Sequence, residues 1–279
     1  MAALRVGRKS LEGQYRERTK ALLELAADLP ARPTPDQIHD LRVTARRLQM
    51  MRRLLPREAR GSQSFKSYGL ALKSVLRATS QLRDLDTLMD TLGSHKANLP
   101  GDLLVALENQ RSDAAARARA ATDVLAEAPA PDFDSYRLRG KRLTKRLKRR
   151  VRKSRDSASE LMVQVLRDES KVKELHALRK EVKKMRYLLE LADGSPSQLP
   201  SLTKWQESLG AIHDLDVAIV YVERGLAESK GRAILELKRA RNSKYLKLVR
   251  EYRTDLMGAF GESKASPADL RPAPGLNLV

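Results

Sequence analysis

The amino-acid sequence predicts an all-α protein made of two similar halves, each a bundle of about four helices. Leu, Ala, Glu, Lys and Arg dominate the 279 residues, only 4% of residues are aromatic, and runs of β-branched residues are missing. Such a composition is typical of helical proteins. Apolar residues recur at helical spacing between proline or glycine clusters at 30–35, 56–61, 93–101, 128–132 and 194–200. An internal repeat then separates the two halves.

The repeat begins with a basic motif that contains a histidine. IHDLRVTARRLQMMRRLL at 38–55 returns as LHALRKEVKKMRYLLEL at 175–191. His39 matches His176 at an offset of 137 residues, and both segments have the apolar spacing of an amphipathic helix.

A second motif, which carries aspartates, is repeated in the same order. QLRDLDTLMDTL at 81–92 returns as AIHDLDVAIVYV at 211–222, with Asp86 matching Asp216 at an offset of 130 residues. Two motifs repeated in order at nearly the same offset indicate a duplicated architecture.

These repeats set the expected domain organisation. We expect one domain over residues 8–260, with a first half at about 8–127, a second half at about 133–260 and a flexible tail at 261–279, which has three prolines and no periodicity. The two halves should form two pseudo-symmetric four-helix bundles packed side by side.

The first basic motif has signals for both ends of its helix. Thr34, Pro35 and Gln37 match an N-cap, a first-turn proline and a capping box, which predicts a helix that begins at Pro35 and ends before Pro56. Projection of the helix places an apolar seam (Leu41, Ala45, Leu48, Leu55) opposite a cationic stripe (His39, Arg42, Arg46, Gln49, Arg53). The second copy has an equivalent seam (Leu175, Leu178, Val182, Met185, Leu189) and stripe (His176, Arg179, Lys180, Lys183, Arg186, Tyr187).

A cationic stripe on one helix is usually a solvated face, but two observations favour a binding face. Like charges three and four residues apart repel each other, and the first stripe has no acid on its outward positions after Asp40. The histidines at positions 39, 176 and 213 all fall inside the repeated motifs. A third basic segment, YRLRGKRLTKRLKRRVRKSR at 136–155, has twelve Lys or Arg residues and no acid.

The overall charge indicates an anionic partner. Lys and Arg number 55 against 35 Asp and Glu, a formal net charge of +20, which a compact fold tolerates poorly without an anion. The absence of cysteine excludes disulfides and thiol catalysis. We expect a soluble, cytoplasmic protein without a membrane partner, because no run of 18 uncharged apolar residues and no secretory signal occurs.

The aspartates of the second motif are candidates for orienting other side chains. Asp86 lies one turn after Arg83, and Asp216 lies one turn after His213, so each carboxylate can pair along its own helix or with a base on a neighbouring helix. A metal site is disfavoured, because the cations that surround these carboxylates would repel a divalent ion. The short IHD sequence is also insufficient to indicate a His-Asp phosphohydrolase.

The motifs of the two halves resemble the signature pairs of the CHAD family, the conserved histidine α-helical domains. HDLRVTARR with LRDLD in the first half, and HALRKEVKK with LGAIHDLDV in the second, carry the resemblance, which covers roughly residues 8–260. It implies two pseudo-symmetric helical bundles, with a basic central channel or groove that binds inorganic polyphosphate, and association with polyphosphate granules.

The first half departs from the family pattern at two places. Gln49 stands where a basic residue is usual, and Thr79-Ser80 stands where the second copy has the family-like Leu209-Gly210. We therefore expect fewer phosphate contacts from the first half at this turn, and of Arg52 and Arg53 the projection favours only Arg53 as a compensating cation.

The scarcity of aromatic residues favours polyphosphate over nucleic acid. Polyphosphate has no bases, whereas proteins that bind single-stranded nucleic acid usually interleave aromatics with cations, and this chain has one Trp and three Phe. General binding of RNA or DNA remains the alternative. A hydrolase or kinase is disfavoured because neither a phosphate loop nor an acidic cluster is present, so we expect no enzymatic activity, no cofactor and no metal.

The predicted site thus combines both repeats and the third basic segment. We expect His39 and His176 to donate hydrogen bonds to phosphate oxygens, and Asp86 and Asp216 to orient their neighbours. The expected polyphosphate-binding residues are His39, Arg42, Arg46, Arg47, Arg53, Arg83, Arg139, Arg142, Lys145, Arg146, Arg149, His176, Arg179, Lys180, Lys183, Lys184, Arg186 and His213.

Overall fold

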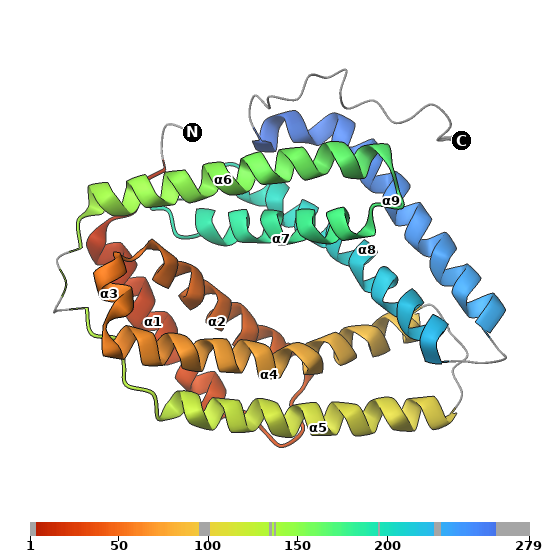
Figure 1. The fold of residues 1–279 in the computed structure, drawn as a ribbon, viewed down its shortest axis with the longest axis horizontal. Helices are drawn as coiled ribbons and strands as arrows, with labels where there is room; N and C mark the ends of the chain where they lie inside the picture. The colour runs from red at the N-terminus through yellow and green to blue at the C-terminus, as the bar shows by residue number, and fades with distance from the viewer. Residues whose placement is uncertain are drawn as a thin grey trace. The chain divides into compact units, whose positions relative to one another are not determined.

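The structure is a computed structural model of the chain, and it describes residues 4–94, 101–133, 136, 138–194, 196–225 and 230–260. Within these ranges the chain forms helices joined by turns and loops, with no β-strand, so the predicted all-α class is confirmed. The helices are α1 (Arg8–Ala27), α2 (Pro35–Leu54), α3 (Arg57–Gly61), α4 (Gln63–Ser94), α5 (Gly101–Ala126), α6 (Gly140–Arg167), α7 (Val172–Leu189), α8 (Leu199–Gly225) and α9 (Lys230–Phe260) (Figure 1). The predicted flexible tail at 261–279 lies outside the described residues.

Two compact units divide the chain. The N-terminal unit contains Leu4–Asp90 and Leu99–Leu147, and the C-terminal unit is formed mainly by Lys148–Val279. The division falls inside α6, so the proline-containing segment 128–132 belongs entirely to the N-terminal unit. The N-terminal unit contains the first copy of both repeated motifs except for Thr91 and Leu92, which are assigned to the C-terminal unit together with the second copies. The pseudo-symmetry of two four-helix bundles and the basic channel stay predictions.

Helix α2, which carries the first basic motif, begins and ends where the sequence predicts. The Thr34 hydroxyl oxygen accepts a hydrogen bond from the Gln37 backbone N–H at 3.2 Å, and the Gln37 side-chain oxygen accepts one from the Thr34 N–H at 2.9 Å. Pro35 occupies the first turn, and the helix ends at Leu54, two residues before Pro56. The capping box is therefore confirmed, and it fixes the start of the histidine-bearing helix.

The N-terminal unit is organised around an aromatic cluster. Helix α1 packs against α2 and α5, and it places Tyr15 against Phe65 of α4 and Phe133 of the segment that follows α5. The Phe65 and Phe133 rings meet edge to face, with their centroids 4.9 Å apart. Such contacts stabilise aromatic pairs beyond the area that they bury, so this cluster holds α1, α4 and the segment after α5 together.

The C-terminal unit is built around α8, which packs against α7 and α9. The inward seam predicted for the second basic motif, including Leu178, Val182 and Met185 of α7, is buried as expected. On α9, the hydroxyl of Tyr245 donates a hydrogen bond to the Val165 carbonyl oxygen of α6 at 2.6 Å. Burial raises the pKa of Tyr245 to about 12, so this hydroxyl stays protonated and continues to donate.

Two buried tyrosines give a test of these cores. The hydroxyl of Tyr15 has no hydrogen-bond partner among the described residues, whereas that of Tyr245 has one. Replacement of Tyr15 by Phe should raise the free energy of unfolding by about 1 kcal/mol, because it removes a buried polar group that gains nothing from folding. Replacement of Tyr245 by Phe should lower it by about 1 kcal/mol. Urea unfolding of both variants checks the expected opposite signs, and equal losses would contradict it.

Candidate functional site

The second copies of the two motifs meet in a histidine pair. His176 of α7 and His213 of α8 lie with Nε2 and Nδ1 2.8 Å apart and with their rings edge to face. Either nitrogen can donate, so the tautomers of the two rings are coupled through one hydrogen. The structure thus brings together two of the predicted phosphate-binding histidines.

Asp216 lies beside this pair and is itself held in place. Its Oδ2 is 3.4 Å from His176 Nε2, close enough for electrostatic attraction, and its Oδ1 accepts a hydrogen bond from Arg241 Nε at 3.1 Å. Arg241 of α9 also donates through Nη2 to the Glu169 carbonyl oxygen, which precedes α7, at 2.8 Å. Asp216 is 7% exposed, so this set of contacts fixes a buried carboxylate next to His176.

The N-terminal unit contains the same arrangement around Asp86. Arg111 of α5 donates through Nε to Asp86 Oδ1 at 2.7 Å, and through Nη2 to the Pro33 carbonyl oxygen, which precedes α2, at 2.7 Å. We call each set of arginine, aspartate and carbonyl an Arg–Asp clamp. Each clamp ties three segments of its unit together, and the predicted orienting carboxylates are therefore part of the structural framework.

The clamp arginines were not predicted from the sequence, although a signal exists. Arg111 follows Asp86 by 25 residues, and Arg241 follows Asp216 by the same number. Arg111 and Arg241 are thus separated by the 130-residue offset of the second motif. Extension of the repeat beyond the two motifs would have identified both residues.

Arg42 corrects the predicted cationic stripe of α2. It is 5% exposed rather than outward-facing, and its Nη1 donates to the Leu76 carbonyl oxygen at 3.0 Å and to the Thr79 hydroxyl at 2.8 Å. The projection failed because α4 supplies two acceptors to a side chain at the edge of the buried face. In the C-terminal unit, where Leu209 replaces Thr79, Arg179 is half-buried and its Nε lies near Gly210.

The remaining predicted cations of α2 and α4 differ in exposure. His39 is exposed, and Arg46, Arg47, Arg53 and Arg83 are half-buried. Arg52, which the projection did not favour as a phosphate contact, donates to the carbonyl oxygens of Phe65 at 3.0 Å and Arg60 at 3.3 Å. Its guanidinium lies across Gly69, where a Cβ would come within 2.6 Å of Arg52 Cζ. Arg52 therefore joins α2 to α4.

The stripe of α7 is partly neutralised by acids on the same helix or just beyond it. Lys184 pairs with Glu181 at 3.0 Å, and Arg186 pairs with Glu190 at 3.2 Å. Tyr187, which was predicted to face outward, is buried at 2% exposure, because its ring packs inside the unit with the Arg186 guanidinium 4.8 Å from its centroid. Lys180 is exposed, and Arg179 and Lys183 are half-buried.

The predicted cations of α6, together with Arg139 directly before it, are divided along the chain between the two units. Arg139, Arg142 and Lys145 in the N-terminal unit and Arg149 in the C-terminal unit are exposed. Arg146 is half-buried and donates to the Leu54 carbonyl oxygen at the end of α2, at 3.2 Å.

The histidine pair is partly buried and has both cations and the Asp216 carboxylate near it. Burial lowers the pKa of His213 to about 4, with further lowering by Arg179, His176 and Lys180 against a smaller opposing effect of Asp216. His213 is therefore neutral at neutral pH, and an anion that offsets the nearby cations would make its protonation easier.

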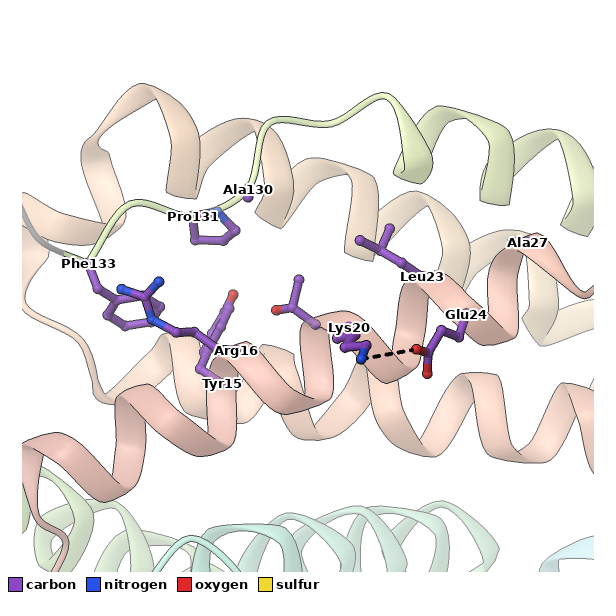
Figure 2. A pocket seen from close by; sticks show the side chains of 10 residues that line it. Tyr15, Arg16, Lys20, Leu23, Glu24, Ala27, Ala130, Pro131 and Phe133 are labelled. Atoms are coloured by element: carbon purple, nitrogen blue, oxygen red, sulfur yellow. Dashed lines mark ion pairs between the residues drawn. The ribbon is translucent and has the colours of Figure 1, made fainter.

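A hollow in the N-terminal unit differs from the histidine site because its walls are mainly apolar. Figure 2 shows this hollow, of about 500 Å³, between α1 and the segment after α5. Tyr15, Leu23 and Phe133 form apolar walls, and the Lys20–Glu24 ion pair, 3.8 Å between Nζ and Oε1, lies at one side. None of the residues predicted to bind phosphate lines it, so it does not form part of the candidate site.

Neither a metal site nor a membrane-spanning helix is found in the described part of the chain. No group of three or more His, Asp or Glu side chains there is arranged to hold a metal ion. Among the helices described, none combines the length and apolar character needed to span a bilayer.

Fold and site together define an all-α protein in which histidine-bearing basic helices are anchored by buried Arg–Asp clamps. The chain belongs to the CHAD domain family, whose sequence model matches residues 13–223. The fold is similar to a crystal structure of the CHAD domain from the plant Ricinus communis, with a TM-score of 0.53 and 18% identity over 93% of this chain and 92% of the other. Comparison with curated protein sequences gives no match.

Loss of a clamp carboxylate should be costly. Replacement of Asp216 by Asn should lower the free energy of unfolding by about 3 kcal/mol, because Arg241 would remain buried with an unpaired charge. Replacement of Glu24 by Gln, which breaks the exposed Lys20–Glu24 pair, should change it by less than about 0.5 kcal/mol. Urea unfolding at pH 7 compares the two variants, and similar small losses would show that the clamp is not a stabilising element.

The lowered pKa of His213 predicts a pH dependence of stability. Between pH 4 and 6.5 the unfolded chain binds a proton at this residue and the folded chain does not, so the free energy of unfolding should rise with pH across this window. Replacement of His213 by Asn should reduce the slope by at most about 1.4 kcal/mol per pH unit. Carboxylates contribute to both profiles alike, so identical slopes would contradict the shifted pKa.

Proposed function

We propose that this protein binds inorganic polyphosphate through its histidine-bearing and arginine-rich helices, without catalysing a reaction on it. The observation that carries the proposal is the group of cations near the His176–His213 pair. Burial, Arg179, His176 and Lys180 lower the pKa of His213, and Asp216 raises it in part, so an anion bound here would offset the remaining effect of the cations.

The chemistry of the available side chains fits a chain of phosphates. Arginine offers forked hydrogen bonds to phosphate oxygens and lysine a mobile point charge. A proton taken up by the histidine pair on binding would add a donor, because each ring nitrogen of a charged imidazole carries a hydrogen.

Burial of most of the described aromatic residues, with Tyr136 and Tyr221 half-buried, supports polyphosphate over nucleic acid. Tyr187 on the basic helix, Trp205 on α8 and Phe65 and Phe133 in the N-terminal unit are all buried. Buried rings cannot stack on bases, which is the main sequence-independent contribution to binding of single strands. The positive charge alone would still attract DNA and RNA at low salt. Binding to polyphosphate would place the protein at cytoplasmic polyphosphate granules.

Calorimetric titration with long-chain polyphosphate, DNA and RNA at equal phosphate concentration tests the proposal. We expect polyphosphate to bind most tightly and its affinity to fall steeply with salt, since each cation that contacts a single strand contributes about 0.7 to the slope of log K against log salt. A variant with Arg179 and Lys180 both replaced by Gln should bind roughly tenfold or more weakly. Its slope should be shallower by about 1.4.

The matched control replaces Arg239 and Lys244 by Gln. Both are exposed on α9 of the same unit, outside the predicted site, and the charge change is identical. Equal weakening in both double variants, or equal affinity for the three polyanions, would contradict binding at the histidine-bearing site.

A further inference from the structure

A small pocket in the N-terminal unit gathers three arginines of α6 and its preceding residue. Its volume is about 160 Å³, which holds several water molecules at about 30 Å³ each and is below the size of typical small-molecule sites. Arg139, Arg142 and Arg146 follow each other at spacings of three and four residues and all line it, as expected for one face of a helix. The pocket therefore has the size and charge for one compact anion.

The three guanidinium groups are not neutralised inside the unit. The side chains of Arg139 and Arg142 have no hydrogen-bond or ion-pair partner among the described residues. Arg146 donates through Nη1 to the Leu54 carbonyl oxygen at 3.2 Å, which fixes its position without removing its charge. Repulsion among three such cations is relieved when an anion enters the pocket.

The other residues that line the pocket restrict which anion it can hold. Leu138 and Leu143, both buried, provide apolar surface, where water competes less for hydrogen bonds. Glu58 of α3 contributes the one carboxylate in the lining. A carboxylate repels an ionised phosphate oxygen but accepts a hydrogen bond from a P–O–H group.

A chain end can use all of these groups, whereas an internal unit of the chain cannot. A terminal phosphoryl group has three non-bridging oxygens, and with a pKa near 6 one of them is partly protonated around neutral pH. An internal unit of a polyphosphate chain has two such oxygens and no hydrogen to donate. We propose that this pocket binds the terminal phosphoryl group of a linear polyphosphate chain, an inference that rests on the proposed function.

Short phosphates of matched length test for recognition of the end. Tripolyphosphate has two ends, whereas cyclic trimetaphosphate has the same number of phosphorus atoms and no end. We expect the wild-type protein to prefer the linear compound in calorimetric titrations. Replacement of Arg142 by Gln should reduce the ratio of linear to cyclic affinity by roughly tenfold, because it removes charge-assisted hydrogen bonds from the pocket.

Replacement of Arg119 by Gln is the matched control. Arg119 is exposed on α5 in the same unit, outside the pocket, so this variant should keep the wild-type ratio. Both variants lose one positive charge, and each ratio compares the same two compounds. The effect of the charge difference between tripolyphosphate and trimetaphosphate should therefore be similar in both variants. A ratio that is unchanged in the Arg142 variant, or equally reduced in the Arg119 variant, would overturn the inference.

Two further arms separate this inference from its alternatives. The affinity of the wild type for long-chain polyphosphate separates the two proposals. Absence of long-chain binding would overturn the proposed function, whereas long-chain binding with an unchanged ratio of linear to cyclic affinity in the Arg142 variant would overturn this inference alone. Inorganic phosphate should compete with tripolyphosphate only weakly. Competition at equal concentration would identify a free-phosphate site and overturn the assignment to chain ends.

The role of Glu58 gives an independent readout. As pH rises from 5.5 to 8.5, the terminal phosphoryl group loses its proton, which adds a negative charge that the arginines attract and the Glu58 carboxylate repels. The arginines that face this group, Arg139, Arg142 and Arg146, stay charged throughout. We therefore expect the affinity for tripolyphosphate to rise with pH, and to rise more steeply when Gln replaces Glu58. An unchanged pH profile in that variant would count against contact between Glu58 and the ligand.

Discussion

The two buried Arg–Asp clamps set the geometry on which the rest of each unit depends. An aspartate at 6 or 7% exposure requires a charged partner, because an isolated carboxylate is expensive to bury. Arg111 and Arg241 supply it, and each also binds a carbonyl oxygen directly before a basic helix. One side chain thus fixes the distance between the helix that carries the aspartate and the start of the helix that carries the histidine. In the C-terminal unit the result is the close approach of His176 and His213.

A chain with a net charge of +20 also has to pack its cations, and arginine does so through the backbone. Arg42, Arg52 and Arg146 each donate to at least one main-chain carbonyl oxygen of a neighbouring segment. Carbonyl oxygens have a second lone pair, so they can accept from a guanidinium while they remain bonded within their helix. These arginines act as ties between helices, and the buried Arg42 is not available to a ligand, although the helix projection placed it on the cationic stripe. Lysine, with a compact and strongly hydrated ammonium, is less suited to such ties.

Sequence reasoning reached the fold more completely than the site. Helix α2 could be bounded from Thr34, Pro35 and Gln37 because capping is decided by residues close in the chain. The apolar seams followed from periodicity alone. Arg42 was placed wrongly because a projection gives the direction of a side chain but not the acceptors of a helix 34 residues away. The outward placement of Tyr187 was wrong for a related reason, since a tyrosine at the edge of an apolar seam can turn its ring inward. The pocket beside α6 depends on where the short helix α3 packs, which no local pattern encodes.

The backbone carbonyl oxygen in each clamp affects how far the sequences of the two repeated halves can diverge. The carbonyl oxygen belongs to Pro33 in one unit and to Glu169 in the other. These two side chains differ in every property, and the contact tolerates the difference because only the main chain makes it. Natural selection acting on this contact is blind to the residue type at that position, so substitutions can accumulate there without loss of geometry. Homologous segments anchored in this way can drift to low identity while their arrangement persists. A search for relatives of such proteins gains more from backbone superposition than from residue matching at the anchor points.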